Sequence, residues 1–368
     1  MSTTTIAGQI LTPDGFVRGR LRCTAVIRAI EPIADAPEDR FVLPGFIDLH
    51  VHGGDGADCM AGADAVRRMA RFHVRHGTTA LLATTVTAPR HDLLAAFRGI
   101  GAAMANSDPA AARVLGAHLE GPFISPAALG AQPPFAIAPD LGLVDDLAAL
   151  APIRVATMAP EIDPDGVLLA HFRALGVRAQ IGHTTCSYAE AKAALAAGAA
   201  GFTHLFNAMS GLHHRRPGAV GAALAHGAWA ELILDFVHVD EGAARAALRA
   251  IPHLYCITDA VAATGMPPGE YRLGQHRIVK EENAVRLADG TLAGSILTMD
   301  RALRNLLHLG LSLERAATRC ATLQADYLGL KERGRLAPGA VADVVVVDRA
   351  GRLQAVFLEG RPVPGAPD

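Results

Sequence analysis

Histidines and carboxylates occur where hydrophobic segments of this chain end. Imidazole nitrogen and carboxylate oxygen together suit a divalent ion of the zinc or iron type, and they hardly suit calcium or magnesium alone. Enzymes built on a barrel of parallel strands keep their chemistry at such strand ends. The chain therefore predicts a metal-dependent site. The residues concerned are His50, His52, Glu120, His183, His204, His238 and Asp259.

The histidines in this set differ from the other histidines of the chain by their position. His50 and His52 alternate along one segment, so both side chains can point to the same face of a strand. A single histidine at a strand end is usually structural, but five of them joined by two carboxylates favour a functional site. Structural roles are expected instead for His213, His214, His226, His253 and His308.

Composition limits the classes of protein to consider. The 368 residues carry 34 Lys+Arg against 36 Asp+Glu, and 51% are hydrophobic, which excludes intrinsic disorder and gives no charge footprint for nucleic acid or an anionic membrane. Five scattered cysteines without a Cys-x-x-Cys pair favour a reducing compartment. The first residues do not resemble a signal peptide, and charged residues interrupt the most apolar stretch, 221–239. We expect a soluble, cytoplasmic protein.

The middle of the chain repeats a strand, loop and helix pattern about eight times. Ala-rich helical segments, such as 188–197 and 241–250, separate the predicted strands. Such repetition predicts an α/β fold in which a parallel sheet closes into a (β/α)8 TIM-like barrel. The predicted strands are Gly45–Leu49, Ala80–Thr84, Val114–Leu119, Val155–Met158, Arg178–Ile181, Gly201–Thr203, Leu232–Phe236 and Tyr255–Thr258.

Both ends of the chain contain short β segments. The first forty residues alternate apolar runs with turn signals such as Asp14-Gly15, and the β-branched run 344–347 reads as a buried strand. Neither end can hold a core alone, so we predict that residues 1–42 and 336–368 form one small β-sandwich domain around a catalytic barrel of residues 43–335. Residues 265–290 lack periodicity and are expected to form a loop or hairpin excursion.

Longer motifs in the chain resemble a known family. They are PGFIDLHVHGGDGAD, GAHLEGPFISP, GHTTC, THLFNAM, RRPG, TDA, LAGSILTMD and LAPGAVADVVVVD. In this order, from about Leu43 to Asp348, they resemble the N-acetylglucosamine-6-phosphate deacetylase family of the amidohydrolase superfamily. The LEGPF and HLFNAM motifs are narrow signatures, whereas His-x-His is shared by the whole superfamily.

The resemblance implies roles for the strand-end residues. Glu120, His183 and His204 would be ligands of the principal metal, and Asp259 would be the catalytic acid and base. Family members hold one or two ions, and those with one can lack the His-x-His motif. Because this chain keeps His50 and His52, a second ion bridged by Glu120 is expected. Zinc or iron, one or two ions per subunit, is the implied cofactor.

The resemblance also implies a pocket for a phosphorylated amino sugar. Arg215 would reach the active site of a neighbouring subunit, so a homodimer is expected. Where the family commonly shows Gly-Ala-His-Pro, this chain has Gln132 in place of histidine, so the sugar preference can differ. The implied substrate residues are Ala131, Gln132, Asn207, Ala208, Arg215, His238, Leu292, Ala293 and Gly294.

The leading hypothesis is metal-dependent removal of the acetyl group from N-acetylglucosamine 6-phosphate. A related amidohydrolase activity, on N-acetylgalactosamine 6-phosphate or another N-acyl compound such as an acyl amino acid, or on a ring amine, is the alternative. A third class is a non-catalytic binding protein, which would typically have lost metal ligands. A small phosphorylated sugar and a second copy of the chain are the expected partners, with neither nucleic acid nor membrane.

Overall fold

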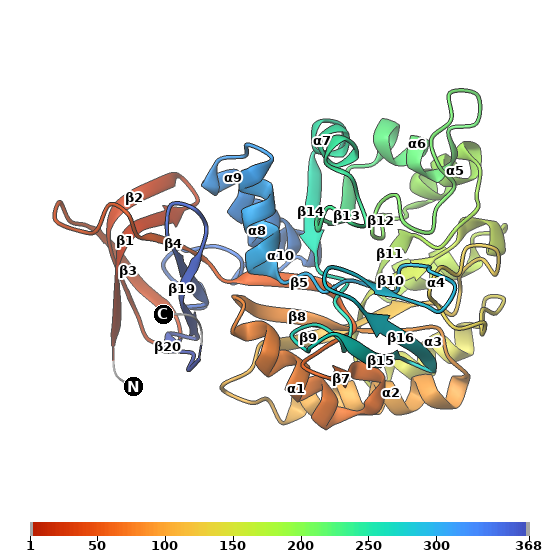
Figure 1. Cartoon of the computed structure of the whole chain (residues 1–368), viewed down its shortest axis with the longest axis horizontal. Helices are drawn as coiled ribbons and strands as arrows, with labels where there is room; N and C mark the ends of the chain where they lie inside the picture. The colour runs from red at the N-terminus through yellow and green to blue at the C-terminus, as the bar shows by residue number, and fades with distance from the viewer. Residues whose placement is uncertain (1–2, 366–368) are drawn as a thin grey trace.

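The computed structural model describes residues 3–365, and these residues form a barrel with a separate β-sheet beside it (Figure 1). Eight parallel strands pair in the order β14-β13-β12-β11-β10-β9-β8-β5, as the sequence pattern predicted. Between β5 and β14 the barrel closes through one parallel bridge, Val51 to Ala260. The strands are β5 (Phe46–Val51), β8 (Thr78–Thr85), β9 (Arg113–Glu120), β10 (Ile153–Met158), β11 (Arg178–Ile181), β12 (Gly201–Phe202), β13 (Trp229–Ile233) and β14 (His253–Ile257).

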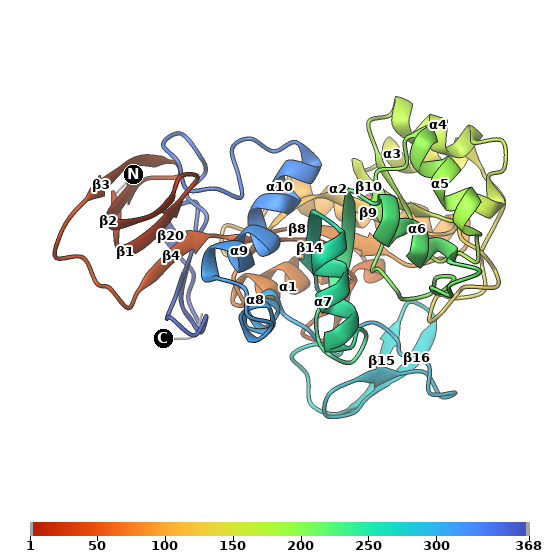
Figure 2. The ribbon, with the colours of Figure 1, turned by 90° about the horizontal axis from the view of Figure 1, so that it is seen from above.

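One helix follows each barrel strand along the chain, and together these helices cover the outside of the barrel (Figures 1 and 2). Strands covered on both sides are buried throughout, and all eight residues of β8 are buried. The helices are α1 (Ala63–Val74), α2 (Arg90–Ala105), α3 (Leu141–Ala148), α4 (Val167–Ala174), α5 (Tyr188–Ala197), α6 (Gly218–His226), α7 (Glu241–Ala250) and α8 (Met299–His308). Further along lie α9 (Leu313–Ala317), a π-helical turn (Thr318–Thr322) and α10 (Leu323–Leu328).

Local sequence explains several of these boundaries. Helix α5 begins at a capping box, in which the Ser187 side chain accepts a hydrogen bond from the backbone of Glu190 and the Glu190 side chain accepts one from the backbone of Ser187. The predicted bounds of α5 and α7 match the structure. Strand β13 starts and ends three residues before its predicted bounds, because Phe236 has a positive φ of 62° and the chain already turns there.

The two ends of the chain meet in one seven-stranded sheet, in the order β20-β19-β18-β4-β1-β2-β3. It has its own buried core, which includes Ile6, Ile10, Leu21, Val344 and Val346. The predicted boundary at residues 42 and 43 falls inside β4. The strands are β1 (Thr4–Thr12), β2 (Gly15–Cys23), β3 (Ile27–Pro32), β4 (Phe41–Pro44), β18 (Val344–Val347), β19 (Leu353–Leu358) and β20 (Arg361–Pro362).

A single residue, Gly45, separates β4 of the terminal sheet from β5, the first strand of the barrel. Its backbone N–H donates to the carbonyl of Asp343, 2.9 Å away, and a Cβ at this position would lie 2.3 Å from the Thr79 hydroxyl. Only glycine therefore fits between β4 and β5. Arg113 of β9 adds a second link, with two hydrogen bonds of 2.9 and 2.8 Å to the carboxylate of Glu359. The first barrel strand is thus held directly by the terminal sheet.

Short elements surround the carboxyl ends of the barrel strands. The predicted excursion forms a three-stranded antiparallel sheet, which stands away from the barrel helices in Figure 2. The remaining short elements are a small hairpin and two single turns of 3-10 helix. In chain order these elements are β6 (Gly53–Gly54), β7 (Ala57–Asp58), Cys59–Ala61, Pro160–Ile162, β15 (Gly269–Leu273), β16 (His276–Lys280) and β17 (Val285–Arg286). Among the described residues, no helix is both long enough and apolar enough to cross a bilayer.

Candidate active site

The predicted strand-end residues converge at one end of the barrel. They line, or lie directly beneath, a cavity of about 350 Å³. Residues distant in sequence meet there because the carboxyl ends of parallel strands share one face of the barrel. The lining residues predicted from the sequence are His52, Glu120, Ala131, Gln132, His183, His204, Asn207, Ala208, His238, Asp259, Leu292 and Gly294.

One group of possible metal ligands comes from β9 and the loops after β11 and β12. The Glu120 Oε1 atom lies 3.1 Å from Nε2 of His183 and 2.9 Å from Nε2 of His204. The two Nε2 atoms are themselves 3.1 Å apart. Three ligand atoms this close together suit one small cation.

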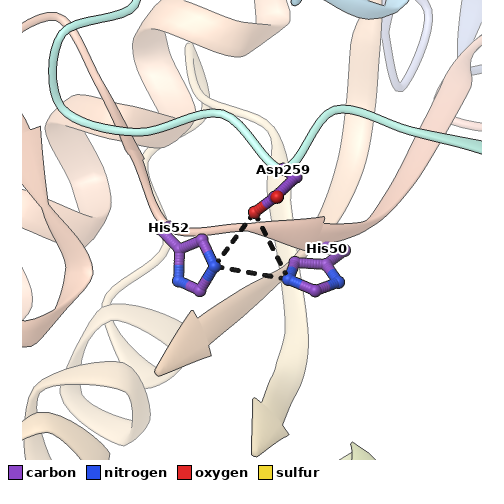
Figure 3. A group of neighbouring side chains, drawn as sticks. All are labelled: His50, His52 and Asp259. Carbon is purple, nitrogen blue, oxygen red and sulfur yellow. Dashed lines mark hydrogen bonds and ion pairs between the residues drawn. The ribbon is translucent and has the colours of Figure 1, made fainter. Parts of the chain in front are cut away.

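A second group lies beside the first (Figure 3). His50 of β5 and His52, which directly follows that strand, point toward each other, with 3.3 Å between their Nε2 atoms, and Asp259 points at both rings. Asp259 Oδ1 lies 3.1 Å from His52 Nε2 and 3.5 Å from His50 Nε2. Glu120 joins the two groups, because its other oxygen, Oε2, lies 3.2 Å from His52 Nε2.

Hydrogen bonds at the far side of the rings show that these residues fit a metal. The Nδ1 atoms of His50, His52 and His183 lie 2.9–3.0 Å from the Glu231 carboxylate, the Thr84 carbonyl and the Ala128 carbonyl. Each Nδ1 therefore donates its proton, which leaves an Nε2 lone pair facing the site. Several lone pairs and a carboxylate facing one another repel unless a cation lies between them. A divalent metal satisfies this arrangement.

The charged groups of the site stabilise one another. Where no metal is bound, a proton can take its place on Nε2 of His52: burial disfavours the charged form of this histidine, but hydrogen bonds and charges from Asp259 and Glu120 outweigh it and raise its pKa to about 9. Burial likewise opposes ionisation of Glu120, yet the charge of His50 and hydrogen bonds from His183 and His204 hold its pKa well below the ordinary value. The pKa of Asp259 is lowered for the same reason, by His50 and His52 against the effect of burial. Both carboxylates therefore remain negative at neutral pH.

Four of the site residues have an unusual backbone conformation. His183, His204, Ala208 and Asp259 have positive φ values of 45°, 27°, 49° and 51°. Such conformations are unfavourable for residues other than glycine and occur where the surrounding structure enforces them, often at functional sites. The N–H of Asp259, for example, donates to the carbonyl of His50, 2.8 Å away. The fold thus fixes both the side chains and their backbone.

Gln132 has a different environment from the one expected for a sugar-binding residue. Its Nε2 donates to Glu120 Oε2 at 2.6 Å, and its Oε1 accepts from the backbone N–H of Thr87 at 2.7 Å. One Nε2 hydrogen remains for the cavity. Gln132 therefore lines the cavity and at the same time orients the carboxylate that joins the two ligand groups.

The cavity also contains groups suited to an anion. His238 donates from Nδ1 to Asp235, 2.7 Å away; burial opposes its charged form, but this bond and the Asp235 charge raise its pKa. Arg286 of β17 lines the cavity, and within residues 3–365 it forms no ion pair. The backbone N–H of Ala208 makes no hydrogen bond in the same part of the chain. By contrast, the Asn207 amide nitrogen donates to the carbonyls of His204 and Leu205, so it holds the turn after β12.

Three predicted site residues do not line this cavity. His50 is fully buried beneath it, with only its Nε2 directed at the site. Ala293 is buried in a cluster with Val261 and Val285. Arg215 lies on the exposed loop before α6, where its guanidinium contacts His214. Arg215 is not among the residues that line the cavity.

The sequence interpretation missed several residues around the site. Leu273, Arg286, Gly290 and Thr291 come from the excursion, where no periodicity indicated which side chains face inward. Glu231 lies under the cavity in the otherwise apolar strand β13, and in the sequence it is one of the charged residues that interrupt the apolar stretch 221–239. An acidic residue inside a predicted buried strand is the signal that could have identified it.

Comparison with known proteins supports the geometry. Residues 41–363 match the model of the amidohydrolase family. N-acetylgalactosamine-6-phosphate deacetylase of Escherichia coli O157:H7 is 37% identical over 96% of this chain and 97% of its own length. N-acetylglucosamine-6-phosphate deacetylase of Lysinibacillus sphaericus is 39% identical over 88% of this chain and 85% of its own length.

A solved structure agrees over nearly the whole chain. It is a mutant of N-acetyl-D-glucosamine-6-phosphate deacetylase from Mycobacterium smegmatis in complex with N-acetyl-D-glucosamine 6-phosphate. Its TM-score is 0.91 at 34% identity, and the match covers 99% of this chain and 100% of the other. Barrel and terminal sheet are therefore both shared with that protein.

Proposed function

The chain belongs to the amidohydrolase family, and from that premise we propose that it removes the acetyl group from N-acetylglucosamine 6-phosphate. The products are glucosamine 6-phosphate and acetate. One observation carries the proposal: Glu120, His183, His204 and Asp259 meet at a cavity that also contains cationic groups. Those four residues can carry out amide hydrolysis with a bound metal, and the cationic groups can bind a phosphate.

The metal centre proposed here uses both ligand groups. Glu120, His183 and His204 would hold the principal ion, and His50 and His52, together with Glu120, would hold a second ion. Imidazole-rich sites of this kind favour zinc or iron. A divalent ion bound here polarises the acyl carbonyl and lowers the pKa of a bound water toward ~7.

Asp259 is proposed as the acid and base. Its carboxylate is ionised, so it can take a proton from the attacking water. It then delivers that proton to the departing nitrogen, which converts a poor leaving group into a neutral amine. The short contact to His52 keeps the carboxylate directed at the cavity.

Substrate binding is divided between two parts of the cavity. His238, Arg286 and the free N–H of Ala208 are proposed to bind the phosphate, since charged donors form strong hydrogen bonds to phosphate oxygens. Asn207 supports the loop that presents Ala208. Ala131, Gln132, Leu292 and Gly294 contact the sugar and acetyl group, and the buried Ala293 packs behind them.

Arg215 is proposed to complete the phosphate site of a second subunit in a homodimer. It is an exposed arginine that lies outside the cavity of its own chain, and a permanent cation suits this role. We place the enzyme in the cytoplasm. All five cysteines are buried and unpaired, which suits a reducing compartment.

N-acetylgalactosamine 6-phosphate is the second candidate substrate. The Escherichia coli relative acts on it according to its name, and that relative matches this chain over almost its full length. In addition, Gln132 is held by Glu120 and Thr87 in place of the histidine common in the family. The two sugars differ only in one hydroxyl orientation, so direct kinetics must separate them.

Acetate release tests the proposal. The purified protein is assayed with both hexosamine phosphates, with unphosphorylated N-acetylglucosamine and with an N-acetyl amino acid. We expect the highest kcat/KM with N-acetylglucosamine 6-phosphate and a loss on the order of 10²-fold without the phosphate, because at least two charged hydrogen bonds are then missing. A higher value with the galactosamine epimer would favour the second candidate. Acetate release from the acyl amino acid alone would overturn the assignment.

A further inference from the structure

Glu231 of β13 is a buried carboxylate directly beneath the proposed metal centre. Its side chain is fully buried in the barrel interior and does not line the cavity. An ionisable group in this position is costly unless several donors satisfy it. Its partners therefore indicate what it does.

One oxygen of Glu231 serves both ligand groups. Oε2 accepts from Nδ1 of His50 at 3.0 Å and from the backbone N–H of His204 at 3.1 Å. The other oxygen, Oε1, accepts from the Tyr255 hydroxyl at 3.4 Å. His50 belongs to the proposed second ion and His204 to the principal ion, so a single atom contacts a ligand residue of each.

Glu231, His50 and His118 also form a cluster with metal-ligand spacing, but their nitrogens are already committed. His118 Nδ1 lies 3.0 Å from the Leu49 carbonyl, and its Nε2 lies 2.8 Å from the Thr157 hydroxyl. His50 Nδ1 donates to Glu231. This cluster therefore supports the ligands and is not itself a third ion site.

The contact with His50 determines which nitrogen faces the metal centre. A proton held on Nδ1 by Glu231 leaves Nε2 with a lone pair, 3.3 Å from His52 Nε2 and 3.5 Å from Glu120 Oε1. Without an acceptor at Nδ1, the proton can occupy Nε2 instead, and the ring then cannot bind a cation. The contact with His204 holds its backbone at a φ of 27°, which directs that ring at Glu120.

We propose that Glu231 is a positioning residue that prepares both halves of the metal centre through one oxygen. It sets the tautomer of His50 and fixes the backbone of His204. The inference rests on the proposed function only for the presence of two ions. It adds that uptake of the ion held by His50 and His52 depends on a residue that touches neither metal nor substrate.

Three variants test the role of Glu231. Glu231→Leu removes both acceptors at similar volume, whereas Glu231→Gln keeps an oxygen acceptor in the same place. Tyr255→Phe is the matched control, because it removes the partner of the other oxygen and leaves His50 and His204 untouched. Zinc titrations against a competing chelator measure the number of ions bound and their affinities, and thermal unfolding checks that each variant is folded.

We expect the wild type to bind two equivalents of zinc. The affinity for the second zinc ion should fall about 10–100-fold in Glu231→Leu. Glu231→Gln is expected to recover most of this loss, and Tyr255→Phe to bind like the wild type. If Glu231→Leu does not fold, the NMR spectra of Glu231→Gln and Tyr255→Phe decide. The proposal then requires that the ¹⁵N signal of a protonated His50 Nδ1 persists in both variants.

Three results would overturn the proposal: wild-type affinity in Glu231→Leu, an equal loss in Tyr255→Phe, or a wild type that takes up one ion only. The titration uses no substrate, so its outcome is independent of the acetate assay. Weaker metal binding in Glu231→Leu, together with a wild type that hydrolyses no hexosamine phosphate, would refute the proposed function and leave this inference standing.

Discussion

At the scale of single residues, the position of Asp259 concentrates three effects on one carboxylate. It has a positive φ, it is almost fully buried, and its Oδ1 lies within 3.5 Å of two imidazole nitrogens. Burial alone would favour the neutral acid, but the histidines keep it ionised. The carboxylate is therefore in its ionised, basic form at neutral pH.

Asp259→Asn is predicted to bind metal and to lose nearly all turnover. The amide keeps the size of the side chain but cannot take up or deliver a proton, so kcat should fall by about 10²–10⁴-fold. Acetate release measures the rate, and elemental analysis measures the metal. Asp64→Asn, an exposed position at the start of α1, serves as the control. Activity within tenfold of the wild type would remove Asp259 from the mechanism.

At the scale of elements, helix α1 is tied to the loop that follows the His-x-His strand. His73 on α1 is buried, and its Nε2 donates to the carbonyl of Gly53, 2.9 Å away. Its Nδ1 has no hydrogen-bond partner in the described chain. Burial lowers the pKa of His73 to about 4. The helix thus positions the loop with a histidine that must remain neutral.

This histidine should make the folded state sensitive to acid. Because the folded pKa lies below the unfolded value of about 6.5, the native state binds fewer protons, so its contribution is present above pH 6.5 and is lost as pH falls toward 4. The resulting loss in the free energy of unfolding is about 3 kcal/mol once His73 would be fully protonated. Denaturant unfolding of wild type and His73→Gln across this range should give curves that converge in acid, whereas the exposed His91→Gln should follow the wild type. Parallel curves for wild type and His73→Gln would refute the assignment.

Elements also show what the sequence could and could not predict. The barrel, the terminal sheet and the bounds of α5 and α7 followed from the repeated strand and helix pattern, Ala-rich helical segments and β-branched runs. The residues proposed as metal ligands stand out by their type at strand ends, and their individual roles are implied by the family resemblance alone. Arg286 could not be predicted, because a short antiparallel excursion gives no periodic signal of which side chains turn inward. Glu231 needed the three-dimensional neighbours His50 and His204 to acquire a meaning.

At the scale of the whole molecule, Arg215 predicts that two chains share each active site. Glu120, Asp259 and the histidines come from one chain, whereas Arg215 lies on an exposed loop and does not line the cavity of its own chain. In a two-fold dimer whose interface includes this loop, each Arg215 would lie against the other subunit. The prediction can be tested without a structure of the assembly.

Mixed dimers of Asp259→Asn and Arg215→Ala should recover activity. Both defects then fall in the same site and the other site is intact, so a purified heterodimer with two different tags should reach about half of the wild-type rate. Each homodimer should be nearly inactive under the same conditions. Heterodimers as inactive as the parent variants would show that Arg215 acts within its own chain, whereas a fully active Arg215→Ala homodimer would show that Arg215 takes no part.

The strand order of the terminal sheet has a consequence for synthesis on the ribosome. β4 lies between β1, made at the start, and β18, made some three hundred residues later. At about 5–20 residues per second, the nascent chain carries this unpaired β4 edge for roughly 15–60 s while the barrel emerges. The strand that covers the edge of β4 is thus translated long after β4 itself, and a nascent chain halted before β18 exposes an unpaired edge for chaperones to shield.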